Sequence, residues 1–311
     1  MWHRLAMKPP NWVHVWCKHE LGAAPVNELL SSVAMSSVVA VELDDGRSVV
    51  LKKRPDEQGR AKHCVSAQYW LAVGGFPCAR PVTCATVIDG MAIHAEEWLP
   101  GGMLMREDDE EAARRSAVLL ADLMVRLEGI DVHPPLPNPA WVRWDHTDPG
   151  IFPSYEWHDA RATLMPLPAW IEEAAQRVRA RMSSVALPRV VGHADWEAQN
   201  LRWRGHQPHA VHDWDSLAYL PEAAIAGAAA GDFASAEIPS LAPLDSSHAF
   251  LDAYEEARGR AFTTEETNVA WAASLWPTLH NARGEVLYEQ PPVALTALEE
   301  QVDVRLALAR A

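Results

Sequence analysis

The fold is best indicated by the stretch Gly192-His193-Ala194-Asp195-Trp196-Glu197-Ala198-Gln199-Asn200, which is followed by His212-Asp213-Trp214-Asp215. It has the form H-x-D-x-x-x-x-N, and a second aspartate, Asp213, follows the short apolar run Ala210-Val211. Phosphoryl transfer from a nucleotide needs a carboxylate to accept the proton of the attacking hydroxyl, and oxygen ligands for Mg²⁺. Asp195 is a candidate for the carboxylate, and Asn200 and Asp213 are candidates for the metal ligands.

The residues before this stretch predict a small β-rich region. Four apolar runs pair into two hairpins, because an Asp-Gly step between two β-branched runs is typical of a hairpin turn. The runs cover residues 37–43, 48–53, 83–87 and 92–97, with turns at Asp45-Gly46 and Asp89-Gly90. A helix is expected over residues 61–73, since Gly74-Gly75 would end it. Lys52, at the end of the second run, could place a cation over the phosphates.

The character of the chain changes after Leu99-Pro100-Gly101-Gly102. Residues 108–128 have the periodicity of a long amphipathic helix, and the rest of the chain is mostly Ala-rich and helical in pattern. Short apolar runs return only within residues 189–215. The sequence therefore predicts a β-rich N-terminal region and a larger helical region that contains a β insertion.

Four elements in this order resemble the aminoglycoside phosphotransferase (APH) family, small-molecule kinases with a protein-kinase-like fold. They are Val49-Val50-Leu51-Lys52, Glu96-Glu97-Trp98-Leu99-Pro100-Gly101-Gly102, the His193–Asn200 loop and Asp213. The likeness runs from about residue 30 to about residue 220. It implies an α+β bilobal fold, with a nucleotide-binding N-terminal lobe over residues 1–99. A helical C-terminal lobe over residues 100–311 would carry the catalytic loop and the acceptor site.

The resemblance implies roles for the residues that match the catalytic elements. Asp195 would be the base or the orienting group for the substrate hydroxyl, and His193 would orient the loop. Asn200 and Asp213 would bind Mg²⁺.

Further matches concern the nucleotide, which would be ATP or GTP. Lys52 would contact the α and β phosphates. Glu97 and Leu99 lie in the segment that resembles the hinge whose backbone holds the adenine. Ser36 and Ser37 lie where a glycine-rich phosphate loop is expected, and their backbone amides could contact phosphate.

The sequence departs from the family pattern in two places. The family pairs its strand lysine with a glutamate on the following helix, but residues 54–73 hold only two carboxylates, both ahead of the expected helix. Gln68 or Ser66 could face the lysine instead. In the catalytic loop, Glu197 and Gln199 replace the common His and Gly, which alters the shape of the loop.

Composition narrows the class of partner. The 311 residues include 27 Lys and Arg against 42 Asp and Glu, a net charge of −15. This charge disfavours nucleic acid and anionic membranes and weakly favours a cationic acceptor. The four cysteines form no C-x-x-C pair, and no apolar stretch reaches the length of a membrane span, so we expect a cytoplasmic protein.

The function expected from these observations is ATP- or GTP-dependent, Mg²⁺-dependent phosphorylation of a small-molecule hydroxyl, with an aminoglycoside or related amino sugar as the first candidate acceptor. A kinase of an uncharged or choline-like metabolite shares the same motifs. A catalytically silent nucleotide-binding protein is a further alternative, because the usual glutamate partner of Lys52 is missing. A metal-dependent hydrolase would use His193, Asp195 and the later histidines. The candidate ammonium contacts are Asp215, Glu222, Asp232, Glu255 and Glu256.

Overall fold

The computed structural model describes residues 9–33, 36–132, 136–154, 159, 161–162, 165–236 and 238–311. The chain divides into two compact units, which are considered separately below. Unit 1 comprises Met1–Gly101, Ile130–Pro137 and Ala210–Asp215, and unit 2 comprises Gly102–Gly129, Asn138–His209 and Ser216–Ala311. Within the described ranges, no helix is both long and apolar enough to cross a membrane.

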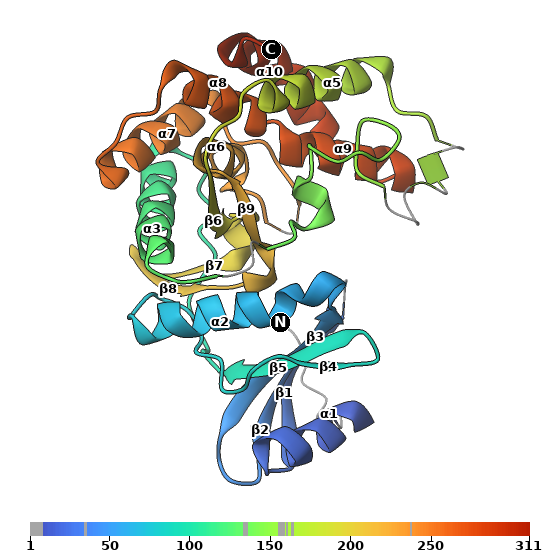
Figure 1. The fold of residues 1–311 in the computed structure, drawn as a ribbon, viewed down its shortest axis with the longest axis vertical. Coiled ribbons are helices and arrows are strands. Elements are labelled where there is room, and N and C mark those ends of the chain that lie inside the picture. Colours follow the sequence, from blue (N-terminus) through green and yellow to red (C-terminus); the bar gives the residue numbers. More distant parts are fainter. Residues whose placement is uncertain are drawn as a thin grey trace. The chain divides into compact units, whose positions relative to one another are not determined.

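Unit 1 is built on a five-stranded antiparallel sheet with the strand order β1-β2-β3-β5-β4 (Figure 1). The strands are β1 (Pro25–Val33), β2 (Ser37–Leu43), β3 (Ser48–Pro55), β4 (Thr86–Ile88) and β5 (Met91–Glu97). Both predicted hairpins are confirmed, and the glycines of their turns, Gly46 and Gly90, have φ of +85° and +74°. Strand β1 was not expected from the sequence, because its exposed face carries little hydrophobic alternation.

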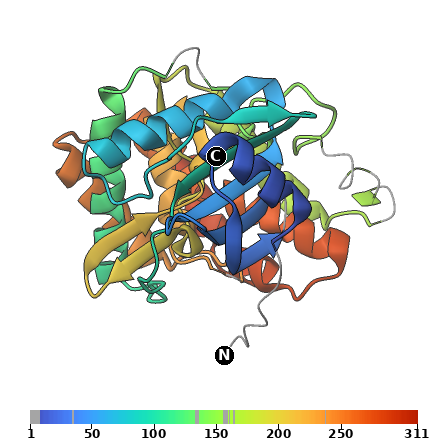
Figure 2. The same cartoon turned by 90° about the horizontal axis from the view of Figure 1, so that it is seen from below.

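Helix α1 (Asn11–Trp16) and helix α2 (Arg60–Val73) lie on opposite faces of this sheet (Figure 1 and Figure 2). Alternate residues of a strand point to the same side of the sheet. On the face under α1, these residues are apolar. Its buried core joins α1 to the sheet through Val13, Trp16, Val39, Val41, Leu43, Val49, Leu51, Ile93 and Ala95. Lys53 also lies on the α1 side, with its ammonium 5.2 Å from the centre of the Trp12 ring.

The opposite face of the sheet carries charge. Lys52 and Arg54 of β3 alternate with the apolar residues, and His94 and Glu96 of β5 lie beside them on the same face. Arg54, His94 and Glu96 are 7%, 1% and 2% exposed, so these polar groups are desolvated and need partners. The partners that they find are described with the candidate site.

The segment Ala210–Asp215 belongs to unit 1 although it follows the catalytic loop in sequence. The Val211 N–H donates to the carbonyl of Pro77 at 2.7 Å. The buried Trp214 ring packs edge-on against Phe76, with 6.0 Å between ring centres. These contacts fix the backbone on both sides of Asp213.

Unit 2 is mainly helical. Its long helices are α3 (Glu110–Glu128), α5 (Ala169–Ser183), α6 (Glu222–Asp232), α7 (Leu244–Arg258), α8 (Thr264–Ala273), α9 (Trp276–Tyr288) and α10 (Val293–Ala309). Helices α3 and α6 pack against an antiparallel ribbon of β6 (Arg189–His193) and β9 (Leu217–Pro221). Strands β7 (Leu201–Arg204) and β8 (Gln207–Val211) form a second ribbon, and the last two residues of β8 belong to unit 1.

The predicted α+β class, with a β-rich N-terminal region and a mainly helical C-terminal region, is confirmed.

Candidate active site

The catalytic loop leaves the end of β6 in unit 2. His193 is fully buried and is paired with Leu217 of β9, so the strand ribbon fixes its backbone. Its Nδ1 accepts a hydrogen bond from the backbone N–H of Asp195 at 3.3 Å, and its ring packs edge-on against Trp196. His193 therefore contacts the loop from within the core, and its role in orienting the loop stays a prediction.

Asn200 holds Asp195 from the other end of the loop. Its Nδ2 donates to the Asp195 Oδ2 at 2.8 Å and to the Asp195 backbone oxygen at 3.0 Å. The short 3-10 turn Ala198–Asn200 brings the two residues together across five positions. Because the amide nitrogen is used in this way, the amide oxygen is the atom that Asn200 can offer to a metal ion.

Trp196 anchors the middle of the loop on helix α3. Its ring is 2% exposed, and its Nε1 donates to the hydroxyl of Ser116 at 3.0 Å. The sequence analysis gave Trp196 no role in the chemistry, and in the structure it acts as a fixed support for the loop.

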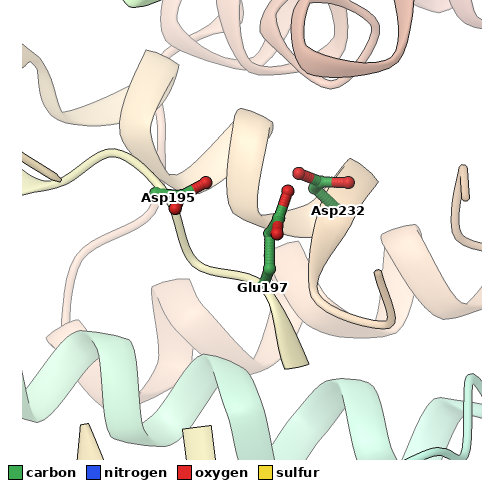
Figure 3. A group of neighbouring side chains, drawn as sticks. All are labelled: Asp195, Glu197 and Asp232. Atoms are coloured by element: carbon green, nitrogen blue, oxygen red, sulfur yellow. The ribbon is translucent and has the colours of Figure 1, made fainter. Parts of the chain in front are cut away.

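Glu197 and Asp232 form a carboxyl pair beside Asp195 (Figure 3). Each of the three residues offers an oxygen within 4.8 Å of the others, and Asp232 comes from the end of helix α6. Burial, with the neighbouring charges of Asp232 and Asp195, raises the pKa of Glu197 well above its usual value. Burial also raises the pKa of Asp232, to which Glu197 is hydrogen-bonded. We expect two buried carboxyl groups in this arrangement to share one proton.

The carboxyl pair is tied to the rest of the loop. The Gln199 side-chain amide donates to Glu197, and the Ser235 hydroxyl donates to Asp232. The Gln199 backbone N–H also donates to the Ser235 carbonyl at 3.3 Å. In the sequence, Glu197 and Gln199 stand out only as departures from the family loop, and Asp232 only as a candidate ammonium contact. Their proximity arises from the packing of α6, which no local pattern reveals.

Lys52 is paired in unit 1, and its partner is Glu96. The Lys52 Nζ lies 3.0 Å from the Glu96 Oε1, with the two side chains 12% and 2% exposed. Burial would raise the pKa of Glu96, but the Lys52 ammonium, together with His94 and the Gln68 amide, lowers that pKa below its usual range. Glu96 is therefore an anion in the folded protein.

The sequence prediction for the environment of Lys52 needs a correction. Gln68 reaches this site, but its Nε2 donates a hydrogen bond to the Glu96 Oε2 at 2.8 Å and not to Lys52. Ser66 is exposed and is not at the site. The family resemblance places Glu96 with Glu97 in the hinge-like segment. In the structure, the Glu96 side chain points to the charged face of the sheet. A strand with a two-residue repeat directs neighbours to opposite faces, which separates these adjacent glutamates.

Asp213 lies in a segment that charges hold in place. The following acidic residue, Asp215, forms an ion pair with the Arg54 Nη1. The Arg60 guanidinium donates to the Asp215 carbonyl at 2.7 Å. Burial opposes ionisation of Asp215, but Arg54 and a hydrogen bond with Asp213 lower its pKa to about 2. Asp213 itself has φ of +60°, a left-handed conformation that aspartate tolerates better than most residues.

The remaining predicted nucleotide contacts lie at the edges of the sheet in unit 1. Ser37 begins β2 and is paired with Val33, and Ser36 precedes it, so both lie at the β1–β2 connection. The Glu97 side chain is 47% exposed and pairs with Arg80. Leu99 follows β5 and is half-buried. The structure places these residues, and their contact with a nucleotide stays a prediction.

The metal-dependent hydrolase considered as an alternative finds no ligand cluster with the later histidines in the described part of the chain. There, the only group of three or more His, Cys, Asp or Glu side chains close enough to share a metal ion is Asp195, Glu197 and Asp232. Later histidines are not part of it, and His206 instead contacts the Arg115 guanidinium. The hydrogen bond between Glu197 and Asp232 fits a shared proton better than a metal ion.

Most of the candidate ammonium contacts are already used by the protein. Glu222 accepts hydrogen bonds from Tyr254, Arg258 and Arg260. Glu255 accepts from the backbone N–H of Phe262 at 2.9 Å. Asp215 and Asp232 have the partners described above. These four carboxylates therefore have partners within the described chain, and their contact with an acceptor ammonium stays a prediction.

The residues predicted to hold a metal ion both offer oxygen ligands. Asn200 offers an amide oxygen, and Asp213 offers a carboxylate. Mg²⁺ prefers such hard oxygen ligands and usually keeps several waters and substrate phosphates in its coordination sphere. The donor set fits Mg²⁺.

Comparison with known proteins agrees with this chemistry. The sequence model of the phosphotransferase enzyme family (APH) matches residues 28–224. A search of curated protein sequences gives no significant match.

Three solved structures share the fold. An amicoumacin kinase, hAmiN, in complex with AMP-PNP, Ca²⁺ and Ami, has a TM-score of 0.62 and 11% identity, covering 93% of this chain and 88% of that one. A spectinomycin phosphotransferase in complex with ADP and spectinomycin has a TM-score of 0.57 and 10% identity, covering 98% and 100%. A choline/ethanolamine kinase family protein from Mesorhizobium loti has a TM-score of 0.57 and 14% identity, covering 91% and 88%. These likenesses confirm the expected kinase-like fold.

Proposed function

Because the chain belongs to the phosphotransferase enzyme family, we propose that it transfers the γ-phosphoryl group of ATP or GTP to a hydroxyl group of a small-molecule acceptor, with Mg²⁺ as the cofactor. The observation that carries the proposal is the Asp195 carboxylate, held by the side chain of Asn200 in a loop of the H-x-D-x-x-x-x-N form. A carboxylate fixed in this way can orient the acceptor hydroxyl and take its proton.

The proposed chemistry gives each of the predicted site residues a role. In unit 2, Asp195 accepts the proton of the attacking hydroxyl, and His193 and Asn200 hold Asp195 in place. In unit 1, the Lys52 ammonium contacts the nucleotide phosphates. Asn200 and Asp213 would hold Mg²⁺, which neutralises charge on the phosphates when bound.

We disfavour the alternative of a catalytically silent protein. That alternative rested on the missing glutamate in the helix after the lysine strand. Glu96 supplies the carboxylate from β5 instead, at 3.0 Å from the Lys52 Nζ. The lysine is thus paired with an anion, as phosphate-binding lysines of kinases are.

We favour an aminoglycoside or a related amino sugar as the acceptor. Two of the similar structures are named as an amicoumacin kinase and a spectinomycin phosphotransferase. The net charge of −15 would attract a cationic acceptor. A choline-like amino alcohol is the second candidate, because a choline/ethanolamine kinase family protein shares the fold.

The test is a phosphotransfer assay with γ-labelled ATP or GTP and Mg²⁺ against a panel of aminoglycosides, amino alcohols and neutral sugars. Mass spectrometry of the acceptor identifies a phosphorylated product. Asp195→Asn should lower kcat by about 10²- to 10⁴-fold, the usual contribution of a general base. Asp122→Asn is the matched control, since Asp122 pairs with Arg126 on the surface of α3.

Two results would contradict the proposal. One is full activity of Asp195→Asn. The other is wild-type protein that binds nucleotide yet phosphorylates no member of the panel.

A further inference from the structure

Helix α2 of this protein lacks the residue that a kinase-like lysine normally pairs with. Its sequence, Arg60–Val73, contains no aspartate or glutamate. The strand lysine is nonetheless buried to 12% exposure, where an unpaired ammonium would be costly. A carboxylate from elsewhere in unit 1 must therefore compensate it.

The register of the sheet supplies that carboxylate. In the antiparallel pair of β3 and β5, Lys52 lies opposite His94, and Val50 lies opposite Glu96. Glu96 is therefore the diagonal neighbour of Lys52 on the same face, a distance that long side chains can bridge. The Nζ to Oε1 distance of 3.0 Å shows that they do.

Helix α2 contributes an amide in place of a carboxylate. The Gln68 Nε2 donates to the Glu96 Oε2 at 2.8 Å and to the carbonyl of Ala79 at 2.7 Å. Gln68 is 1% exposed, so its rotamer is fixed by packing. A glutamate at this position would put two carboxylates against each other in a buried site. The strand glutamate and the helix glutamine are thus complementary.

We infer that Glu96 is the positioning residue that holds the Lys52 ammonium for the nucleotide phosphates, and that Gln68 fixes the Glu96 carboxylate. The inference rests on the proposed function, because it assigns Lys52 to phosphate binding. Lysine and glutamate come from adjacent strands joined by backbone hydrogen bonds. The pair is therefore assembled by the sheet, and helix α2 only supports it.

The first test compares Glu96→Gln with wild type. Without its counter-charge, the flexible Lys52 side chain loses its fixed position. The Kd for Mg²⁺-ATP should rise, and kcat/KM for ATP should fall by about 30-fold or more, as expected when one partner of a buried charge pair is removed. KM for the acceptor should change by less than about threefold. Glu42→Gln is the matched control on the same sheet, since Glu42 bonds only with the exposed Asn27 among the contacts described.

The second test asks whether Glu96 acts through Lys52. Lys52→Met should weaken nucleotide binding, and Glu96→Gln added to it should change kcat/KM for ATP by less than about threefold, because the group that Glu96 positions is gone. Two independent losses that multiply in the double variant would overturn the inference.

The third test moves the carboxylate. Glu96→Gln combined with Gln68→Glu returns the anion to the helix at the same contact. This double variant should recover at least about tenfold of the lost kcat/KM for ATP, whereas Gln68→Glu alone should not improve on wild type. The swap also keeps the inference testable if Glu96→Gln alone folds poorly, and thermal unfolding of each variant monitors the fold.

The outcomes separate this inference from the proposed function. If wild type phosphorylates an acceptor while Glu96→Gln keeps the wild-type Kd and KM for ATP, the inference is wrong and the function stands. If wild type transfers to no acceptor but binds Mg²⁺-ATP, the function fails, and the Kd values of the same variants still decide the role of Glu96. A wild type that binds no nucleotide overturns both.

Discussion

At the residue scale, the groups that carry the proposed chemistry are held by contacts on more than one side. Asp195 is bonded through its backbone to His193 and through its carboxylate to Asn200. Lys52 is bonded to a glutamate that is itself bonded to a glutamine. Preorganised groups of this kind cost little reorganisation during the reaction.

Asp213→Asn tests the metal assignment. An amide is a weaker ligand for Mg²⁺ than a carboxylate, so the Mg²⁺-dependent part of ATP binding should fall by about tenfold or more. Isothermal titration with ATP in Mg²⁺ and in EDTA measures that part directly. Asp89→Asn is the control, because Asp89 is also an aspartate with positive φ, +50°, at an exposed turn of the same unit. Equal Mg²⁺ dependence in Asp213→Asn and wild type would remove Asp213 from the metal site.

Glu197→Gln tests the shared proton. Because the pKa of Glu197 is raised in the folded protein, folding binds a proton, and the free energy of unfolding falls as pH rises above the usual value of 4.5. The glutamine variant cannot titrate and can still donate to Asp232. Its free energy of unfolding, relative to wild type, should therefore increase from about pH 4 to about pH 8.

Urea unfolding across this pH range makes the measurement, with the exposed Glu173→Gln on α5 as the control. Curves for wild type and Glu197→Gln that stay parallel would show that the pair does not share a proton.

At the scale of elements, helix starts and strand register decide where these residues lie. The predicted helix over residues 108–128 begins at Glu110, because Asp109 caps it by accepting from the Ala112 N–H at 2.9 Å. The following Glu110 and Glu111 suit the positive end of the helix dipole. Helix α3 in turn carries Ser116, which receives the Trp196 indole of the catalytic loop.

Asp109→Ala should lower the free energy of unfolding by about 1 kcal/mol, the usual cost of removing an N-cap side chain. Asp108→Ala, one residue earlier and exposed, should change it by less than about 0.5 kcal/mol. Chemical denaturation with both variants measures the difference. Equal values would mean that the cap contributes nothing to α3.

At the scale of the whole molecule, the family, the fold and the acidic charge point to a small-molecule kinase. Binding of a ligand to the folded state alone stabilises it by about 2.7 kcal/mol at 100 times its Kd. For a chain of this size, we expect Mg²⁺-ATP or Mg²⁺-GTP to raise the midpoint of thermal unfolding by about 3–6 °C. Nucleotide without Mg²⁺ should give a smaller shift. No shift with either nucleotide would contradict the proposed nucleotide site.

The sequence by itself determined the features that depend on short-range patterns. The Asp-Gly turns fixed both hairpins, because their backbone geometry follows from two adjacent residues. The spacing from His193 to Asn200 fixed a loop in which Asp195 and Asn200 meet across one short turn. These features need no knowledge of distant contacts.

Only the tertiary structure decided which distant groups meet. The pairing of β3 with β5 brings Lys52 into contact with Glu96. The packing of α6 places Asp232 beside Glu197. The contacts of Trp214 placed the Asp213 segment in unit 1. A buried charge needs a partner wherever the fold can supply one, and sheet register and helix packing determine where that is. For this reason, the carboxylate that the family pattern places on a helix comes from a strand in this chain.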